Sequence, residues 1–200
     1  MNKRLRKRIV DRHSDSLKRF GHHPNALYWS SQGIQELRFK VLSAIGVAAK
    51  DSILDVGCGF ADLKTWLASQ GIKARYTGID ISPDLIAVAK EKHGDEGLFV
   101  GDLYDGGFKA LSFDWVLLSG ALNEPYNDKG KYAKKIIKEM YRICRKGVSF
   151  NLLNDKVVKA HDLQSFDANE VLDYCLTLCQ DCALRDDYLD NDFTIYMRKI

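Results

Sequence analysis

Apolar side chains recur along the chain with two different spacings. Residues 31–46 carry them three and four positions apart and close on a glycine, which predicts an amphipathic helix. Short, mostly apolar runs follow at residues 52–57, 74–80, 98–102 and 113–119, with the length and composition of buried strands. Because helical segments separate most of these strands, the pattern predicts an α/β fold with a doubly wound, mostly parallel sheet.

The segments between strands carry the start and stop signals of helices. Over residues 82–94, Ser82 is placed as an N-cap, Pro83 occupies the first helical position and Gly94 ends the segment. Parallel strands need crossovers of this kind. Helical spacing also predicts helices over residues 61–71, 127–147 and 167–180.

The C-terminal third adds the remaining strands. Residues 148–153 form an apolar run, and the segments 182–189 and 193–199 flank Asp190–Asn191–Asp192, which indicates a hairpin turn. The expected sheet therefore has seven strands, with an antiparallel C-terminal hairpin. No repeat or linker interrupts it, so we expect residues 49–200 to form a single globular unit. Residues 1–48 would form a helical arm that could close over a site as a lid.

The composition narrows the class of protein. The hydrophobic fraction of 46% and the charged fraction of 28% are those of an ordinary globular protein, and no apolar run approaches the length of a membrane span. The N-terminus is basic but lacks the apolar stretch of a secretory signal. Five cysteines, an odd number, do not make a disulfide framework. We therefore expect a cytoplasmic protein without membrane insertion.

The charge is unevenly distributed. Residues 1–20 contain eight Lys or Arg and two Asp, so this segment has a net charge of +6. Because the whole chain has a net charge of +3, the remaining residues are mildly acidic. Such a basic arm could meet RNA or another anionic partner. The alternative is a solvated, partly frayed helix. The arm lacks the interleaved aromatic residues that a base-stacking surface would need.

The loop after the first predicted strand, in LDVGCGF, is rich in glycine. Gly57 and Gly59 stand where a doubly wound sheet binds its ligands, and glycine there lets the backbone approach a ligand closely. The sequence has no G-K-[ST], so this is not a P-loop. The third glycine of a dinucleotide fingerprint would fall on Asp62, so the loop is a poor match to that motif as well.

Acidic residues end three of the predicted strands. Asp55 precedes the glycines and Asp62 follows them, so two carboxylates would repel a pyrophosphate and favour a ligand with positive charge. S-adenosylmethionine (SAM) is such a ligand, because it carries a sulfonium and an ammonium group. Asp80, 21 residues after Gly59, ends the next strand in the position that accepts ribose hydroxyls, and Asp102 ends the third.

The segments ILDVGCGFADL, YTGIDIS, VGDL and FDWVLLSG, in this order and spacing, resemble the class I SAM-dependent methyltransferases over roughly residues 50–155. The resemblance implies a SAM cofactor. It assigns Asp55 to the methionine amino group through water, Asp80 to the ribose, and Asp102 with the Leu103 amide to the adenine. The expected cofactor-binding set is completed by Gly57, Cys58, Gly59, Ile81, Ser119 and Arg38.

Some of these residues have alternative roles. Asp80 could instead cap the helix that starts at Pro83, and Asp102 could be a turn residue before Leu103. Arg38 either reaches the methionyl carboxylate or lies on the surface of its helix.

Three cysteines near the C-terminus have the spacing C-x3-C-x2-C, with which radical SAM enzymes hold an iron–sulfur cluster. Cys175, Cys179 and Cys182 would share one stripe of the predicted helix, spread over about 10 Å of its axis. Their sulfurs would not converge on one cluster. Since free cysteine behaves as a small hydrophobe, we interpret the three as part of the core and expect no metal site.

Methyl transfer is an in-line displacement, and an oxygen or nitrogen nucleophile can require a general base. Candidates are Asn123 and Glu124 after the fourth strand, and Tyr28, His22 and His23 in the N-terminal HHPNALYW. The histidines could equally form an exposed turn and Tyr28 could simply pack. The catalytic residues therefore stay open.

Three classes of function remain. The first is methyl transfer to a small molecule or metabolite, which the lack of a nucleic-acid-binding module favours. The second is an RNA methyltransferase that uses residues 1–20 to bind its substrate. The third is a SAM-binding module without catalysis.

Overall fold

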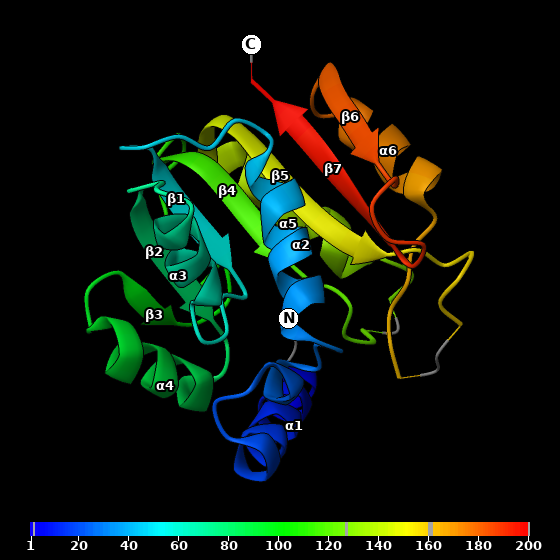
Figure 1. Ribbon diagram of the computed structural model, residues 1–200. Coiled ribbons are helices and arrows are strands. Elements are labelled where there is room, and N and C mark those ends of the chain that lie inside the picture. The colour runs from blue at the N-terminus through cyan, green and yellow to red at the C-terminus, as the bar shows by residue number, and fades with distance from the viewer. Residues whose placement is uncertain (2, 127, 160–161, 200) are drawn as a thin grey trace.

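A central β-sheet organises the computed structural model (Figure 1), which describes residues 1, 3–126, 128–159 and 162–199. Within these residues the sheet has seven strands in the order β3-β2-β1-β4-β5-β7-β6. The strands are β1 (Ser52–Val56), β2 (Arg75–Asp80), β3 (Leu98–Val100), β4 (Phe113–Ser119), β5 (Cys144–Leu153), β6 (Asp181–Arg185) and β7 (Asp192–Arg198).

The strand directions confirm the predicted fold class. Strands β1 to β5 pair in parallel, whereas β7 is antiparallel to both β5 and β6. The predicted hairpin exists, and it folds back so that its second strand lies inside the sheet while β6 forms the edge. The chain changes direction across the sheet between β1 and β4, which is the switch point at which ligands bind in doubly wound folds.

Helices cover both faces of the sheet (Figure 1). Among the described residues, no helix combines the length and the apolar character that a membrane span needs. The helical elements are α1 (Lys3–Phe20), the short 3-10 helix η1 (Pro24–Leu27), α2 (Gln32–Ser43), α3 (Asp62–Ser69), α4 (Pro83–His93), α5 (Lys131–Ile143) and α6 (Ala168–Leu176).

The two faces of the sheet bury separate apolar cores because side chains alternate along each strand. On β4, Val116 and Leu118 pack with α5 and α6 against β5 and β7. Trp115 and Leu117 point to the other face, where they meet α2 and α3. Burial on both faces explains the nearly continuous apolar run of this strand.

The boundary between α5 and β5 differs from the prediction. The predicted helix extends to residue 147, but α5 ends at Ile143 and β5 begins at Cys144. Two cations at this boundary bind acids elsewhere in the sheet: Arg145 contacts Asp114 on β4 at 3.1 Å, and Lys146 contacts Asp51, just before β1, at 2.5 Å. These ion pairs and the pairing with β4 outweigh the helical preference of the segment. Residue 127, where the predicted helix starts, lies outside the described residues.

The C-terminal cysteines do not lie on one helix. Helix α6 ends at Leu176, so Cys179 follows it in a turn and Cys182 lies on β6. The prediction of a single helical stripe is wrong in this respect. Cys175 and Cys179 are buried in the core that α5 and α6 share with the sheet, as expected of small apolar side chains. The described residues contain no group of three His, Cys, Asp or Glu side chains placed to hold a metal ion.

Candidate functional site

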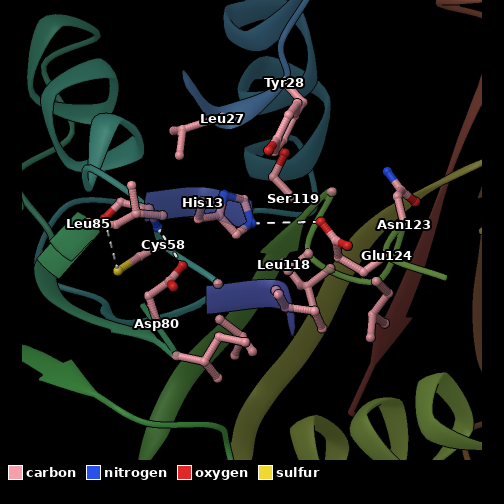
Figure 2. A pocket seen from close by; sticks show the side chains of 18 of the residues that line it. His13, Leu27, Tyr28, Cys58, Asp80, Leu85, Leu118, Ser119, Asn123 and Glu124 are labelled. Atoms are coloured by element: carbon pink, nitrogen blue, oxygen red, sulfur yellow. Dashed lines mark hydrogen bonds and ion pairs between the residues drawn. The ribbon is translucent and has the colours of Figure 1, made fainter. Parts of the chain in front are cut away.

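A cavity of about 320 Å³ lies where the carboxyl ends of β1, β2, β3 and β4 meet. The loop after β1 and the residues that end β2 and β4 form its floor, while α1, η1 and α2 supply its walls (Figure 2). Pockets for small molecules typically measure about 300–1,000 Å³. All ten residues that the sequence assigns to cofactor binding line this cavity: Asp55, Gly57, Cys58, Gly59, Asp80, Ile81, Asp102, Leu103, Ser119 and Arg38.

The glycine loop is tied to the end of β2. The amides of Gly57 and Cys58 both donate to the Ile79 carbonyl, at 2.8 and 3.1 Å. Gly57 has a φ of 72°, and a Cβ at this position would lie 2.3 Å from the Ala121 Cβ. Only glycine therefore lets this loop pass beside the segment after β4.

Asp80 holds the loop from the other side. Its Oδ2 accepts from the Gly59 amide at 3.0 Å and its Oδ1 from the Ser82 amide at 2.9 Å. The helix cap itself is Ser82, whose Oγ accepts from Leu85, so Asp80 is not the capping residue of α4. An ionised carboxylate has about four lone-pair sites. Each oxygen of Asp80 therefore keeps capacity for one further donor from the cavity.

Asp55 is a buried carboxyl group at the end of β1. Its pKa is raised to about 7, mainly by burial; a hydrogen bond from Tyr76 opposes the rise, and the nearby Asp80 and Asp62 carboxylates add to it. That hydrogen bond runs from the Tyr76 hydroxyl to Asp55 Oδ2 at 2.6 Å. A positively charged group in the cavity would stabilise the ionised form of Asp55.

Asp62 does not take part in the cavity, contrary to the charge argument made from the sequence. It is not among the lining residues, and its Oδ1 pairs with Lys92 at 2.8 Å while its Oδ2 accepts from Gln35 at 3.2 Å. The acidic character of the cavity comes instead from Asp55, Asp80, Asp102 and Glu124, which is four carboxyl groups.

Asp102 is both a turn residue and a lining residue. Its Oδ1 accepts from the amides of Tyr104 and Asp105, at 2.9 and 3.1 Å, so the turn that follows β3 depends on it. Its Oδ2 lies 3.8 Å from the N-terminal ammonium of Met1, which also lines the cavity, so a donor from a ligand would share or replace that contact. The side chain of Leu103 is fully buried beneath it.

Arg38 is buried, so it is not a helix-surface residue. Its Nε and Nη2 both donate to the buried carboxylate of Asp192 at the start of β7. The guanidinium also stacks on the Trp29 ring, 4.6 Å from its centroid. Nη1 makes no contact with Asp192 in this pair and lies next to Gly120, directly after Ser119, where a Cβ would be 3.6 Å from it.

The N-terminal residues cover the cavity. Leu27 of η1 lies so close to the glycine loop that a Cβ on Gly59 would be 2.9 Å from it. Helix α1 spans the rim: Ser14 bonds Asp84 at the start of α4, and Arg8 donates to the Pro125 carbonyl after β4, each at 2.5 Å. Because of these contacts, α1 packs against the rest of the protein and is not the solvated, partly frayed helix that was one of the two interpretations of the sequence.

The structure brings three of the five suggested catalytic residues into the cavity: Asn123, Glu124 and Tyr28. The Asn123 side-chain oxygen accepts from the Leu153 amide at 3.2 Å, so it holds β5 against the loop after β4. His22 and His23 are not among the lining residues. His22 packs against Phe60 and faces Asp62, and His23 caps η1.

Two lining residues on α1 were missed from the sequence. Arg12 donates to Glu124 Oε2 at 3.0 Å, and His13 Nε2 lies 3.7 Å from Glu124 Oε1 (Figure 2). Both residues belong to the basic segment 1–20, which the sequence analysis interpreted, from its charge, as a possible binding arm for an anionic partner. No local signal in the sequence indicates that α1 packs over the ends of the strands.

Comparisons with known proteins agree with this geometry. The profile of the family described as "Methyltransferase domain" matches residues 54–152. The chain is 29% identical over 163 residues to Rv1506c of Mycobacterium tuberculosis, a protein named provisionally as a methyltransferase; the match covers 78% of this chain and 97% of that protein. It is 30% identical over 117 residues to the demethylmenaquinone methyltransferase of Listeria welshimeri, with 55% of this chain and 47% of that enzyme covered.

A solved structure shows the same fold. A SAM-dependent methyltransferase from Archaeoglobus fulgidus superposes with a TM-score of 0.64 at 14% identity, over 84% of this chain and 95% of that one. The chain belongs to the class I SAM-dependent methyltransferases, and SAM is its cofactor. The cavity fits that cofactor in its chemistry, because the buried carboxyl groups of Asp55 and Asp80 line it without a Lys or Arg partner among the described residues, and SAM carries two positive groups.

Proposed function

We propose that the protein transfers the methyl group of SAM to a small, neutral, largely apolar acceptor that enters the cavity beside α1. The observation that carries the proposal is the wall of the cavity beyond the strand ends. It is built from apolar and aromatic side chains of α1, η1, the ends of β4 and β5 and the segments that follow these strands, and it includes Ile9, Leu118, Leu122, Tyr126, Leu153 and Leu163. A wall of this kind binds a small apolar molecule rather than a polynucleotide.

The cofactor would lie across the ends of β1 to β4. The two oxygens of Asp80 would accept the ribose hydroxyls, and Asp102 Oδ2 with the Leu103 amide would meet the adenine. The ammonium would lie near Asp55 and the Ser119 carbonyl, and Arg38 Nη1 would meet the carboxylate. The backbone of Gly57 and Gly59, with Cys58 and Ile81, would form the surface beneath it.

When bound, SAM supplies a methyl carbon made electrophilic by the sulfonium. The protein's own contribution would be to hold the acceptor in line with that carbon and to exclude water. Leu27 and α1 are placed to do the second, because they cover the glycine loop and the rim. The sequence led us to expect a lid in residues 1–48. We propose that α1 and η1 form this lid and move to admit the ligands.

The contacts of α1 weigh against RNA as the acceptor. Arg6, Arg8 and Arg12, three of its eight cations, are bound to Asp105, Pro125 and Glu124 of the protein itself. Lys7 and Lys18 pair with acids on α1. Much of the positive charge of residues 1–20 is thus already compensated, which leaves a weaker field for phosphates.

Methyl transfer from isotopically labelled SAM to a cell extract tests this proposal. We expect the label in the small-molecule fraction that partitions into organic solvent, and not in RNA or protein. The double variant Lys18→Gln, Arg19→Gln removes exposed cations far from the cavity and should leave this transfer unchanged. Label in RNA that the double variant loses would favour the RNA methyltransferase. Binding of SAM without labelling of any fraction would favour the non-catalytic module.

The raised pKa of Asp55 predicts that cofactor affinity depends on pH. Below about pH 7 the carboxyl group is mostly protonated, and binding of a cationic ligand must release that proton. The affinity for SAM should therefore rise by up to about tenfold per pH unit toward pH 7 and level off above it. Calorimetric titrations over about three pH units, from about pH 5.5 to about pH 8.5, would measure this change in affinity. Asp55→Asn should flatten the profile, and an affinity that falls with pH would contradict the assignment.

A further inference from the structure

Tyr76 of β2 contacts the cavity only through another residue. Its hydroxyl donates to Asp55 Oδ2 at 2.6 Å, yet Tyr76 is not among the residues that line the cavity, whereas Asp55 is. The Tyr76 ring packs with Cys58 of the glycine loop, Ile86 of α4 and Leu98 of β3. Tyr76 can therefore influence a bound cofactor through the Asp55 carboxyl group and not by touching the ligand.

The pairing of β1 with β2 brings the hydroxyl to the carboxyl group. Asp55 is opposite Gly78, and Tyr76 precedes Gly78 by two positions, so both side chains stand on the same face of the sheet. A Cβ on Gly78 would lie 2.8 Å from the Cys58 sulfur and 3.1 Å from Leu98 Cδ2. Because Gly78 has no side chain, no β2 side chain stands between Tyr76 and Asp55.

The hydrogen bond favours the ionised form of Asp55. Its length of 2.6 Å lies in the range of charge-assisted bonds from a hydroxyl to an anionic oxygen, about 2.5–2.7 Å. Burial raises the pKa of Tyr76 well above its usual value, so the hydroxyl keeps its proton and remains a donor. Among the described residues, no other group donates a hydrogen bond to the Asp55 carboxylate, and this bond opposes the effect of burial on the pKa of Asp55.

The second oxygen of Asp55 is left for a ligand. Oδ1 accepts no hydrogen bond from the described residues, and it is not one of their side-chain atoms that are buried without a partner. Asp55 lines the cavity, so this oxygen is open to it. Because Tyr76 holds Oδ2, Oδ1 is the acceptor that a positively charged group would meet.

None of the other charged or titratable groups around Asp55 can replace Tyr76. They are either acidic, so that they disfavour a second negative charge, or already paired. These groups are Asp80 at the end of β2, Asp62 of α3, the Cys58 thiol of the glycine loop, and Arg38 of α2, which pairs with Asp192.

We propose that Tyr76 is a positioning residue for SAM binding: its hydroxyl keeps the Asp55 carboxylate ionised and leaves the free oxygen directed at the methionyl ammonium. The protein thereby keeps its affinity for the cofactor at a pH where a buried carboxyl group without such a donor would be protonated. This inference rests on the proposed position of the ammonium beside Asp55.

The test compares the SAM affinity of the wild type and Tyr76→Phe by calorimetric titration from about pH 6 to about pH 9. Loss of one hydrogen bond to a charged group raises the pH at which Asp55 ionises by about one to two. Tyr76→Phe should therefore bind SAM about 5–50-fold more weakly at about pH 7, and this difference should shrink as the pH rises and Asp55 ionises in both proteins. The readout is the ratio of the two affinities at each pH, in which any titration of the ligand cancels.

Two further variants serve as controls. Tyr196 is a buried tyrosine of β7 whose hydroxyl donates to the Val41 carbonyl at 2.5 Å, and it does not line the cavity. Tyr196→Phe should keep the wild-type pH profile. In Asp55→Asn there is no charge for Tyr76 to hold, so adding Tyr76→Phe to that variant should change the affinity little at any pH.

The outcomes separate this proposal from the one it rests on. If Asp55→Asn keeps the pH dependence of the wild type, the position of the ammonium is wrong and the role of Tyr76 falls with it. If Asp55→Asn flattens the profile but Tyr76→Phe binds SAM as the wild type does, or more weakly by the same factor at every pH, Tyr76 is not a positioning residue. Circular dichroism should show Tyr76→Phe folded, because the ring stays; an unfolded variant would assign Tyr76 to the fold and overturn the proposal.

Discussion

Replacement of Asp80 by alanine should lower the affinity for SAM and S-adenosylhomocysteine by about 10²–10⁴-fold. The variant removes the acceptors proposed for two ribose hydroxyls, and a hydrogen bond to a charged group contributes about 1.5–3 kcal/mol. It also frees the amides of Gly59 and Ser82, which Asp80 now holds at 3.0 and 2.9 Å, so the glycine loop loses one of its ties to β2 and keeps those to the Ile79 carbonyl. Equilibrium dialysis with labelled SAM would measure the loss.

A second carboxylate serves as the control for Asp80. Asp95 lies after α4 with a side chain that is 88% exposed, and it pairs with Lys90 at 3.4 Å. Asp95→Ala should bind SAM as the wild type does. Circular dichroism should show that Asp80→Ala keeps its secondary structure. Wild-type affinity in a folded Asp80→Ala would contradict the proposed position of the ribose.

Replacement of Arg38 by methionine should lower the free energy of unfolding by about 3–5 kcal/mol, because it leaves Asp192 buried without its partner. For a chain of this length that corresponds to a fall in Tm of about 6–20 °C. Burial raises the pKa of Asp192 and Arg38 lowers it, so the variant should regain stability as the pH falls and the carboxyl group is protonated. Urea unfolding at two pH values would measure both effects.

The double variant Arg38→Met, Asp192→Leu tests the reason for that loss. It removes both charges, so most of the lost stability should return. Because Arg38 Nη1 is also proposed to meet the methionyl carboxylate, the double variant should fold and still bind SAM more weakly than the wild type. A double variant as unstable as Arg38→Met would show that the guanidinium matters through packing on Trp29 rather than through the ion pair.

The floor of the site could be predicted from the sequence because parallel strands end at the same edge of a sheet. Once the strands at residues 52–57, 74–80 and 98–102 were recognised, Asp55, Asp80 and Asp102 had to lie close together. Local rules sufficed, because each carboxylate stands at or next to a strand end. The structure adds why the loop between them needs glycine: a Cβ on Gly57 would meet Ala121.

The cover of the site could not be predicted in the same way. His13 and Glu124 are separated by more than a hundred residues, and only the packing of α1 across the strand ends brings them together. The pairing of Arg38 with Asp192, 154 residues apart, is equally invisible to local patterns. The charge count over residues 1–20 treated all of the cations as free to bind a partner. In the folded protein, several of them instead form ion pairs that hold α1 in place.

Two buried carboxyl groups of the cavity, Asp55 and Asp80, have a consequence for stability. Burial raises the pKa of Asp55 to about 7 and also that of Asp80, so the ligand-free protein loses stability as the pH rises from about 4 through these values. A cationic ligand offsets this cost by stabilising the ionised forms. Residues arranged for binding rather than for stability are typical of functional sites.

Calorimetric titration of the purified protein with S-adenosylhomocysteine, SAM and NAD tests the central claim most directly. The account predicts micromolar binding of the first two and none of NAD, because the acidic strand ends attract an ammonium and repel a pyrophosphate. Binding of NAD more tightly than SAM, or of none of the three by a folded protein, would contradict the assignment of this cavity to SAM.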